Sequence, residues 1–345
     1  MTPLGSALKE RIRLNGPLPV ADFMAECVGR YYASRDPLGG AGDFITAPEI
    51  SQMFGELIAL WAIVVWRSMG EPAEVVLAEL GPGRGTLMAD FLRAADLIPP
   101  FRRALRVHLV ETSPVLRRCQ RGTLTSALVQ WHDEVRMLPP GPLLLIANEF
   151  FDALPIRQFV RRHGIWRERM VGLAGDALVF EDGPPLELQA PPARDGDIFE
   201  VNPPAREIAR WIGRRLTETG GAALLIDYGH PTSAVGDTLQ AVRGHRPVAA
   251  LDEPGETDLT AHVDFQALAE AARPAAASRL VTQGDFLRSL GIELRADRLI
   301  SGAPERADET SIACRRLIDP SGMGTLVKVR ALTHPGLPTP PGFEP

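Results

Sequence analysis

Four short, continuously apolar segments constrain the fold of this chain more than any other feature. Each ends in polar residues, and the segments are VVLAEL, RVHLVE, PLLLIANE and AALLIDYG at positions 75–80, 106–111, 142–149 and 222–229. Uninterrupted apolar runs of this length are typical of strands buried on both faces. The helical pattern TLMADFLRAADLI follows the first run and supplies the crossover of a right-handed βαβ unit. The sequence therefore predicts an α/β fold with a doubly wound, mostly parallel, Rossmann-like sheet.

The remaining segments are expected to surround this sheet. Residues 1–70 are helical in pattern and predict an N-terminal cap, whereas residues 157–205, with Pro, Gly, charge and short β-like pieces, predict an inserted α+β subdomain. The sheet core is assigned to residues 71–156 and 206–335, where HVDFQALAEAA predicts a helix and GTLVKVRAL a closing strand. Residues 336–345 are Pro-rich and are expected to form a mobile tail.

Composition restricts the class of protein. The net charge of −6 argues against a duplex nucleic-acid binder, which normally has a basic face. The three cysteines are scattered without C-x-x-C spacing, so neither a disulfide framework nor a zinc site is expected. The N-terminus lacks the apolar core of a signal peptide, and LIALWAIVVW is too short for a membrane span. We therefore expect a cytoplasmic protein; the sequence does not fix its oligomeric state and is compatible with a dimer.

The turn after the first apolar run, ELGPGRGTL, has the composition of a ligand-binding loop. Gly81, Gly83 and Gly85 allow the backbone to approach a ligand closely, and the helix that follows, near Thr86, presents free N–H groups. The dinucleotide pattern G-x-G-x-x-G and the Walker pattern are both absent from this turn. A tight turn without a ligand is the alternative.

The second apolar run ends at Glu111, where an acid can accept hydrogen bonds from both hydroxyls of a ribose. An ordinary acid at a strand end is the alternative. Together with Glu79 and the glycines, this feature resembles the class I S-adenosylmethionine-dependent methyltransferases. The resemblance implies S-adenosylmethionine as cofactor and S-adenosylhomocysteine as product, with Thr86 and Ser113 beside the binding residues.

Several longer motifs resemble one family more closely. GDFITAPEISQMFGELIALW, ELGPGRGTLMADFLR, LVETSP, ANEFFDALPIRQF, DYGH, GDTLQAVRGHR, PGETDLTAHVDF and TQGDFL are similar to motifs of the MidA family of mitochondrial and bacterial proteins. Mitochondrial members of that family assist respiratory complex I assembly by methylating an arginine of a complex I subunit. The resemblance extends to about residue 330 and departs from the family pattern at VNPP. It implies a protein arginine methyltransferase whose partner is a protein substrate, with a complex I subunit as the expected one.

The third apolar run ends in the candidate catalytic residues Asn148, Glu149 and Asp152, where the methyltransferase superfamily meets the substrate amine. An arginine side chain is cationic and offers forked N–H donors. Carboxylates can therefore bind it bidentately and raise the electron density on the attacking nitrogen. Capping of the helix after the strand is the alternative role for these acids.

Two histidines and an acid in the second half of the chain are further candidates. His245 in GHR, and Asp258 and His262 in TDLTAH, can serve as a general base or as walls of a substrate channel. A histidine ahead of a helix is often structural, which is the alternative. Their spacing does not resemble a metal site, and no metal is expected.

The segment GDFITAPEISQMFGELIALW also predicts a helix entry. Thr46 and Glu49 have the spacing of a capping box, and Pro48 suits a first turn, so a helix is expected to begin near Ala47.

The polar side of this helix entry carries Glu49, Gln52 and Glu56 with no neighbouring Lys or Arg in the segment. If the helix packs across the strand ends, these side chains would face the cofactor or an incoming cationic side chain, with Asp43 and Thr46 at the hinge of a lid. A solvated helix face is the alternative. For Glu49, a second alternative is that it only completes the capping box.

Two other functions are compatible with the same motifs. One is a methyltransferase that acts on another residue or on a small molecule through the same cofactor site. The other is a non-enzymatic assembly factor that retains the fold, which failure to bind S-adenosylmethionine would favour.

Overall fold

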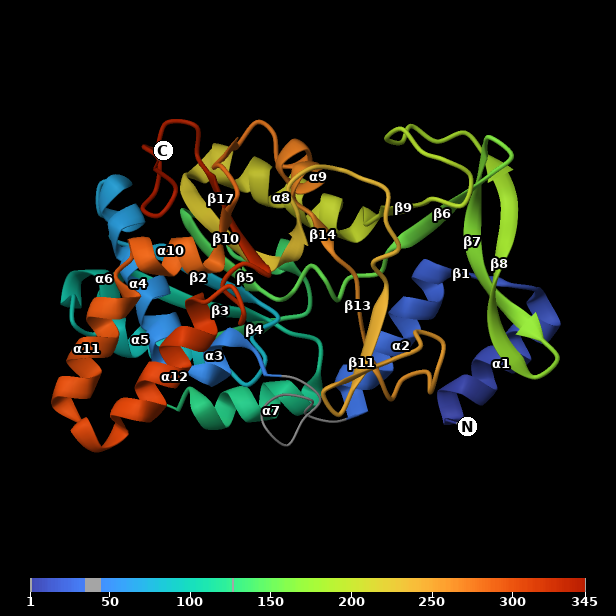
Figure 1. The fold of residues 1–345 in the computed structure, drawn as a ribbon. Helices are drawn as coiled ribbons and strands as arrows, with labels where there is room; N and C mark the ends of the chain where they lie inside the picture. The colour runs from blue at the N-terminus through green and yellow to red at the C-terminus, as the bar shows by residue number, and fades with distance from the viewer. Residues whose placement is uncertain (1, 35–44, 126, 345) are drawn as a thin grey trace.

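The computed structural model describes residues 2–34, 45–125 and 127–344 and places a largely parallel sheet at the centre of the molecule (Figure 1). The strands lie in the order β4, β3, β2, β5, β10 and β17, with the bounds Val129–His132, Leu105–Val110, Val75–Leu80, Leu143–Asn148, Gly221–His230 and Val327–Thr333. Neighbours from β4 to β10 are parallel, whereas β17 is antiparallel to β10. The ends of β10 and β17 carry the short strands β14 (Val263–Asp264), β15 (Ala276–Ala277) and β16 (Val281–Thr282).

Helices cover both faces of this sheet because its strands are apolar on both sides. In β2, Val75 and Leu77 belong to one buried cluster, and Val76 and Ala78 belong to the other. The first cluster includes α4 (Gln52–Ser68), α5 (Thr86–Ala95), α6 (Pro99–Ala104), α10 (Gln283–Ser289), α11 (Ile292–Gly302) and α12 (Ala307–Ile318). The second includes α8 (Pro203–Thr219) and α9 (Phe265–Ala271). The predicted three-layer α/β architecture is confirmed.

The chain reverses its direction of travel across the sheet between β2 and β5. After β2 it adds β3 and β4 on one side, then returns to form β5 on the other side of β2. A crevice forms at the carboxyl ends of strands at such a reversal, and ligands of open α/β sheets bind there. The four apolar runs are confirmed as strands to within one residue at either end, and the closing strand expected in GTLVKVRAL is β17, which begins three residues later. The edge strand β4, whose sequence is VQWH, was not predicted because it lacks a continuous apolar run.

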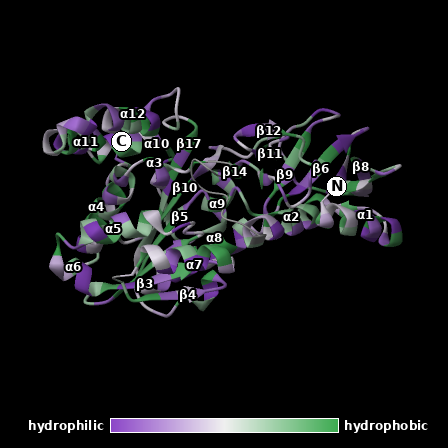
Figure 2. Cartoon of the chain, turned by 90° about the horizontal axis from the view of Figure 1, so that it is seen from below, coloured by the Kyte–Doolittle hydropathy of each residue, from purple (hydrophilic) through white to green (hydrophobic). Residues whose placement is uncertain are grey.

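A second, antiparallel sheet lies at one end of the molecule (Figures 1 and 2). Its strands are β1 (Leu18–Pro19), β6 (Arg157–Arg162), β7 (Ile165–Ala174), β8 (Ala177–Leu186) and β9 (Ile198–Val201). β1 pairs with β7, and Leu8 and Phe23 of α1 (Pro3–Asn15) and α2 (Val20–Ser34) pack with Val171 of β7. Helices α1 and α2 therefore pack with the insertion, whereas α4 belongs to the core of the central sheet.

A small sheet also contributes to this second core. It consists of β11 (Gln240–Arg243), β12 (Arg246–Val248) and β13 (Asp258–Thr260), and its residues Ala241 and Leu259 pack in the same buried cluster as α1 and α2.

The predicted helix near Ala47 is interrupted. α3 (Ala47–Ile50) begins at the expected residue but ends after one turn, since Ser51 adopts an extended conformation with φ −161°. The Ser51 side chain then caps α4 by accepting from the backbone N–H of Met53 at 3.2 Å. Thr46 makes no side-chain capping bond, so the predicted capping box is wrong.

The Pro-rich tail was expected to be mobile, but its described part is packed. Phe343 is only 2% exposed, and its ring centroid lies 5.4 Å from that of Phe286 in α10. Burial of this aromatic ring ties the tail to the first helical layer, as its membership of that core cluster shows. None of the helices in the described ranges has the length and apolar character needed to cross a bilayer.

Candidate active site

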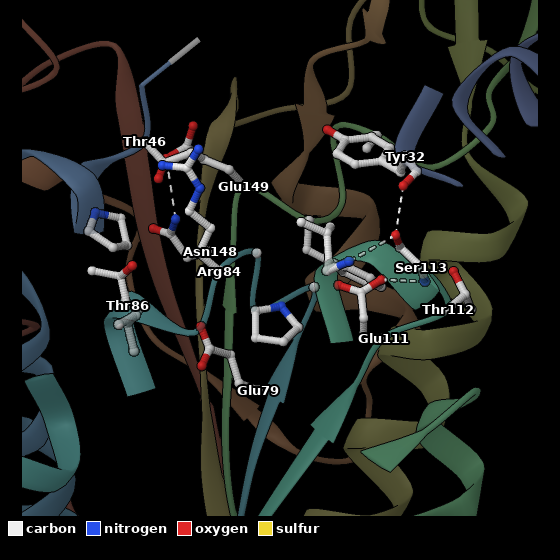
Figure 3. A pocket seen from close by; sticks show the side chains of 18 of the residues that line it. Tyr32, Thr46, Glu79, Arg84, Thr86, Glu111, Thr112, Ser113, Asn148 and Glu149 are labelled. Carbon is white, nitrogen blue, oxygen red and sulfur yellow. Dashed lines mark hydrogen bonds between the residues drawn. The ribbon is translucent and has the colours of Figure 1, made fainter. Parts of the chain in front are cut away.

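A cavity of about 440 Å³ lies at the carboxyl ends of β2, β3 and β5, in the crevice where the strand order reverses (Figure 3). α2 and α3 contribute to its wall through Val28 and Tyr32 on one side and Pro48 on the other. The predicted site residues that line it are Thr46, Glu49, Glu79, Gly81, Gly83, Thr86, Glu111, Ser113, Asn148 and Glu149. The fold thus brings together residues from four separate sequence motifs.

A second cavity of about 550 Å³ adjoins the first one. The two share Gly81, Glu111, Thr112, Phe150 and Leu154 in their walls. Glu111 therefore lies in the wall that the two cavities share.

The glycine turn after β2 has the conformation that its sequence predicts. Gly81, Gly83 and Gly85 have φ values of +60°, +54° and +83°, which side chains rarely adopt. A Cβ at Gly81 would lie only 2.9 Å from the ring of Phe150. Gly85 differs from the prediction, because it does not line the cavity but precedes α5, with Gln120 beside it. The turn therefore exposes backbone to the cavity at Gly81 and Gly83.

Glu79 at the end of β2 is an unusual group to find in a sheet core. Its side chain is 3% exposed, and burial raises its pKa to about 8. One carboxyl oxygen, Oε2, has no hydrogen-bond partner among the residues that the structure describes. Since buried polar atoms are normally paired, this oxygen is suited to a donor group of a bound ligand.

Glu111 at the end of β3 is held in place by two donors. Oε1 accepts from the backbone N–H of Ser113 at 2.8 Å, and Oε2 accepts from Nε2 of Gln120 at 3.2 Å. Burial raises the pKa of Glu111, and these hydrogen bonds act in the opposite direction. A carboxylate has about four acceptor positions, so capacity remains for a hydroxyl donor of a ligand.

Of the two supports of Glu111, the sequence predicted Ser113 as a cofactor-site residue but not Gln120. Gln120 of α7 (Pro114–Thr123) is wholly buried and also donates to the carbonyl oxygen of Gly83 at 2.7 Å. Ser113 donates through Oγ to the carbonyl oxygen of Tyr32 at 2.6 Å. Gln120 thus connects the acid to the glycine turn, and Ser113 connects α2 to the same wall. Only its burial, which depends on the fold, distinguishes Gln120 from a surface residue.

The opposite side of the cavity carries Asn148 and Glu149 (Figure 3). Glu149 Oε1 accepts from Asn148 Nδ2 at 3.2 Å and from the backbone N–H of Ala47 at 3.4 Å, and its carboxyl group also hydrogen-bonds Tyr228. Burial raises its pKa to about 7. Asn148 Oδ1 is buried without a hydrogen-bond partner in the described part of the chain. Two acceptor groups therefore point toward one side of the cavity with capacity for a donor.

Asp152 and Asp258 lie behind this wall and not on it. Asp152 is buried, and its pKa is raised by burial and by the neighbouring Glu149. Asp258 accepts from the hydroxyl of Tyr32 at 3.2 Å, and Tyr32 itself lines the cavity. Both acids are therefore placed to act through a neighbour, and the predicted direct contact of Asp152 with substrate is wrong for this arrangement.

Glu49 closes the cavity over the glycine turn. Its Oε1 accepts from Thr86 Oγ1 at 2.5 Å, and Oε2 lies 3.5 Å from Nη1 of Arg84. This explains why the capping box fails, since the carboxylate is directed at the start of α5 and not at its own helix. It also corrects the expectation that Glu49 lacks a compensating cation.

Two of the other predicted cap residues, Gln52 and Glu56, lie away from the cavity. Gln52 is exposed, and Glu56 forms ion pairs with Arg93 at 3.1 Å and Arg295 at 2.7 Å. These arginines come from α5 and α11, which the sequence could not place beside α4. Asp43 lies outside the described residues.

The two histidines are not in the wall of the cavity either. His245 is exposed in the turn between β11 and β12, with a positive φ of 61°. His262 is exposed next to β14, and its backbone N–H donates to Thr238 Oγ1 at 2.9 Å. The prediction that they are catalytic is therefore not supported by their position.

Comparison with known proteins places the cavity in a wider context. A family model described as "Putative S-adenosyl-L-methionine-dependent methyltransferase" matches residues 57–283. The chain is 36% identical to the mouse (Mus musculus) protein named protein arginine methyltransferase NDUFAF7, mitochondrial, covering 94% of this chain and 83% of the relative. It is 34% identical to the Drosophila melanogaster protein named as a homolog of NDUFAF7, covering 97% and 85% of the two chains.

Solved structures extend the same likeness. A Burkholderia thailandensis protein crystallised with S-adenosyl-homocysteine superimposes with a TM-score of 0.86 at 26% sequence identity, covering 98% of this chain and 93% of that one. A native crystal structure of a protein from the same organism gives a TM-score of 0.82 at 27% identity.

The relatives also correct one expectation. The sequence led us to expect a cytoplasmic protein, but the similar curated proteins from mouse, Drosophila and human are all named as mitochondrial. The cytoplasmic assignment is therefore wrong as an inference from the N-terminal composition alone.

Proposed function

Because the chain belongs to the family of S-adenosylmethionine-dependent methyltransferases, we propose that it methylates an arginine side chain of a protein, and that the cavity described above is the active site. The observation that carries the proposal is the pair Asn148 and Glu149, whose oxygens face one side of a cavity that has glycine backbone on the other. The relatives named protein arginine methyltransferase support the choice of substrate.

The residues present fit the cofactor. Glu111 has acceptor capacity for ribose hydroxyls, and the unpaired Oε2 of Glu79 suits a positively charged amino group. Glu111 lies at the junction of the two cavities, so a ribose held there would have the adenine on one side and the methionine on the other. The positive φ of Gly81 and Gly83 and the exclusion of a Cβ at Gly81 fit a loop that a ligand approaches closely.

When bound, S-adenosylmethionine supplies a methyl group on a positively charged sulfur. The acceptor groups of Asn148 and Glu149 would hold the N–H donors of the substrate guanidinium and fix one nitrogen toward that methyl group. As the nitrogen–carbon bond forms, the sulfur–carbon bond breaks and the sulfur keeps the electron pair. The methylated nitrogen then loses one proton, which Glu149 can accept because burial raises its pKa to about 7. Tyr32 and Pro48 line the same cavity and would limit the space open to water around these groups.

The cavity is suited to a cation. Four carboxyl groups, those of Glu49, Glu79, Glu111 and Glu149, line it together with Arg84, whose guanidinium lies beside Glu49. A guanidinium group would offset this negative charge, whereas a neutral small molecule would not. We propose an arginine on a subunit of respiratory complex I as the target, as the resemblance of the long motifs implies.

Mass spectrometry of proteins from cells with and without the gene tests this function. We expect one arginine to carry a methyl group in normal cells, to lose it in the deletion, and to regain it when the wild-type gene is restored. Restoring the Glu149→Gln variant should leave that arginine unmethylated. A change confined to lysine methylation or to a small metabolite would support a different substrate, and no change at all would support a non-enzymatic assembly factor.

A further inference from the structure

A buried acid outside the cavity organises the loop that carries Glu149. Asp227 lies near the carboxyl end of β10, beside β5, and is 0% exposed. Its Oδ2 accepts from three consecutive backbone N–H groups, those of Phe150, Phe151 and Asp152, at 3.2, 2.9 and 3.3 Å.

The other oxygen of the same carboxyl group is also paired. Asp227 Oδ1 accepts from the backbone N–H of Tyr228 at 2.8 Å. Both oxygens therefore face N–H donors. These contacts counter only part of the effect of burial, which together with Asp152 and Glu149 raises the pKa of Asp227 well above its usual range.

The loop held in this way has an uncommon conformation. Glu149 has a φ of +49°, which is disfavoured for a residue with a Cβ, and its backbone N–H donates to the carbonyl oxygen of Ile226 at 2.8 Å. A strained residue persists where surrounding contacts fix it. The contacts that follow Glu149 in the chain are the three N–H bonds to Asp227.

We infer that Asp227 is a positioning residue of the methyltransferase reaction, which holds the turn 149–152 through its backbone N–H groups so that Glu149 faces the cavity. The inference rests on the proposed function of Glu149. Asp227 itself does not line the cavity and touches no substrate in this assignment.

Other ionisable groups surround Glu149 and Asp152 on several sides. Glu149 and Asp152 face Asp227 and Tyr228 from β10 and Asp258 from β13, and Asp258 in turn accepts from Tyr32 of α2. In the sheet, Lys328 of β17 is opposite Asp227, but its ammonium group donates to the carbonyl oxygen of Thr325.

The charges in this group act in one direction. The pKa of Glu149 is raised to about 7 by burial, and that of Asp152 is raised by burial and by Glu149. The pKa of Asp227 is raised by the same burial and by Asp152 and Glu149. Release of the turn should expose Glu149 to water, lower its pKa and let it ionise at lower pH.

The test uses Asp227→Asn in the full chain. The assay measures transfer of a tritiated methyl group from S-adenosylmethionine to the proteins of an extract from cells that lack the gene. We expect the rate at pH 8 to fall about 10-fold or more because the turn is misplaced, while S-adenosyl-homocysteine affinity stays within about 3-fold. We also expect the acid limb of the rate profile to move about one unit to lower pH.

Asp264→Asn is the matched control. Asp264 is also an acid that accepts a backbone N–H at a strand end, from Ala267 at 2.9 Å, but it caps α9 outside the cavity. This control should keep both the rate and the pH profile of the wild type. An Asp227→Asn protein with the wild-type rate and profile would overturn the inference, as would one whose rate falls with an unmoved acid limb.

Hydrogen exchange of the wild-type protein provides an independent measurement if Asp227→Asn does not fold. The backbone N–H groups of Phe151 and Asp152 lie in no helix or strand, yet their hydrogen bonds to Asp227, which anchor the turn, predict that they exchange slowly. Exchange at the rate of an exposed loop would contradict it. Slow exchange in a wild-type protein without methyl-transfer activity would retain the anchor and reject the proposed function.

Discussion

The two sides of the cavity use carboxylates in opposite ways. On the cofactor side, Glu111 is surrounded by donors, because Ser113 and Gln120 each direct an N–H group at it. On the acceptor side, Glu149 and Asp152 lie together beside a third acid, Asp227. In the first arrangement the donors oppose the effect of burial on the pKa, whereas in the second a neighbouring acid adds to it, which suits groups that exchange protons.

Carboxyl groups in the same cavity can therefore have different roles. Changes on the glycine side should alter cofactor affinity, and changes at Glu149 should alter methyl transfer while leaving that affinity nearly intact. Measuring both cofactor affinity and methyl transfer for each variant therefore tests whether the two sides have separate roles.

The largest effect is expected for Gly81→Val. A Cβ would lie 2.9 Å from the Phe150 ring, and valine is disfavoured at a φ of +60°. Isothermal titration should show S-adenosyl-homocysteine affinity reduced by about 100-fold or more, or about 2.7 kcal/mol. Gly164→Val is the control, since Gly164 has a φ of +79° in the β6–β7 turn with open space around it. Equal affinities of the two variants would remove the glycine turn from the cofactor site.

Glu149→Gln should come next and should affect a different quantity. The amide keeps the size of the side chain but cannot accept a proton, so methyl transfer should fall on the order of 100-fold. Affinity for S-adenosyl-homocysteine should change by less than about 3-fold, as measured by titration. Glu56→Gln is the matched control, because Glu56 is paired with Arg93 and Arg295 away from the cavity. If Glu149→Gln transfers methyl groups as fast as this control, the acceptor-side role is wrong.

Glu111→Ala tests the proposed hydrogen bonds between Glu111 and the ribose. The lost hydrogen bonds involve a charged acceptor and are worth about 1.5–3 kcal/mol each. We expect S-adenosyl-homocysteine affinity to fall by about 10- to 100-fold for each hydroxyl that loses its acceptor, with an unchanged far-ultraviolet circular dichroism spectrum. Unchanged affinity would show that the ribose is held elsewhere.

The pH dependence of transfer distinguishes the two sides without a mutation. Glu149 has a pKa of about 7, and its ionised form is the one that binds a cation and accepts a proton. As pH falls through that value the carboxylate is protonated, so at pH 6 about one-tenth of it is ionised and at pH 8 about nine-tenths. The rate should drop accordingly below pH 7 in single-turnover assays. A flat profile from pH 6 to 8 would exclude ionised Glu149 from the rate-limiting step.

The smallest effect is expected for the histidines. His245 and His262 are exposed and do not line the cavity. Replacing either with alanine should change the rate of methyl transfer by less than about 2-fold, since substitutions away from a site have small effects. A large loss of rate at unchanged stability would return the histidine to the list of catalytic candidates.

The sequence was sufficient to predict the central sheet because its signal is local. Continuous apolar runs marked β2, β3, β5 and β10, and their polar ends marked the crevice. The same logic located Glu79, Glu111 and Glu149, since the carboxyl ends of parallel strands share one edge.

The sequence failed where contacts are made between distant segments. Glu49 and Thr86 are 37 residues apart, and Glu56 and Arg295 are 239 apart, so neither pairing has a local signal. Likewise, Gln120 has no distinguishing feature until α7 packs it beside the glycine turn. The break at Ser51 was missed because the apolar pattern continues across it.

A crystal structure of this protein with S-adenosyl-homocysteine bound would test the account of the cavity most directly. The account predicts that both ribose hydroxyls donate to Glu111, that the amino group lies against Glu79, and that the sulfur faces Asn148 and Glu149. A ribose bound away from Glu111, or a sulfur directed away from Glu149, would contradict the separation of the cavity into a cofactor side and an acceptor side.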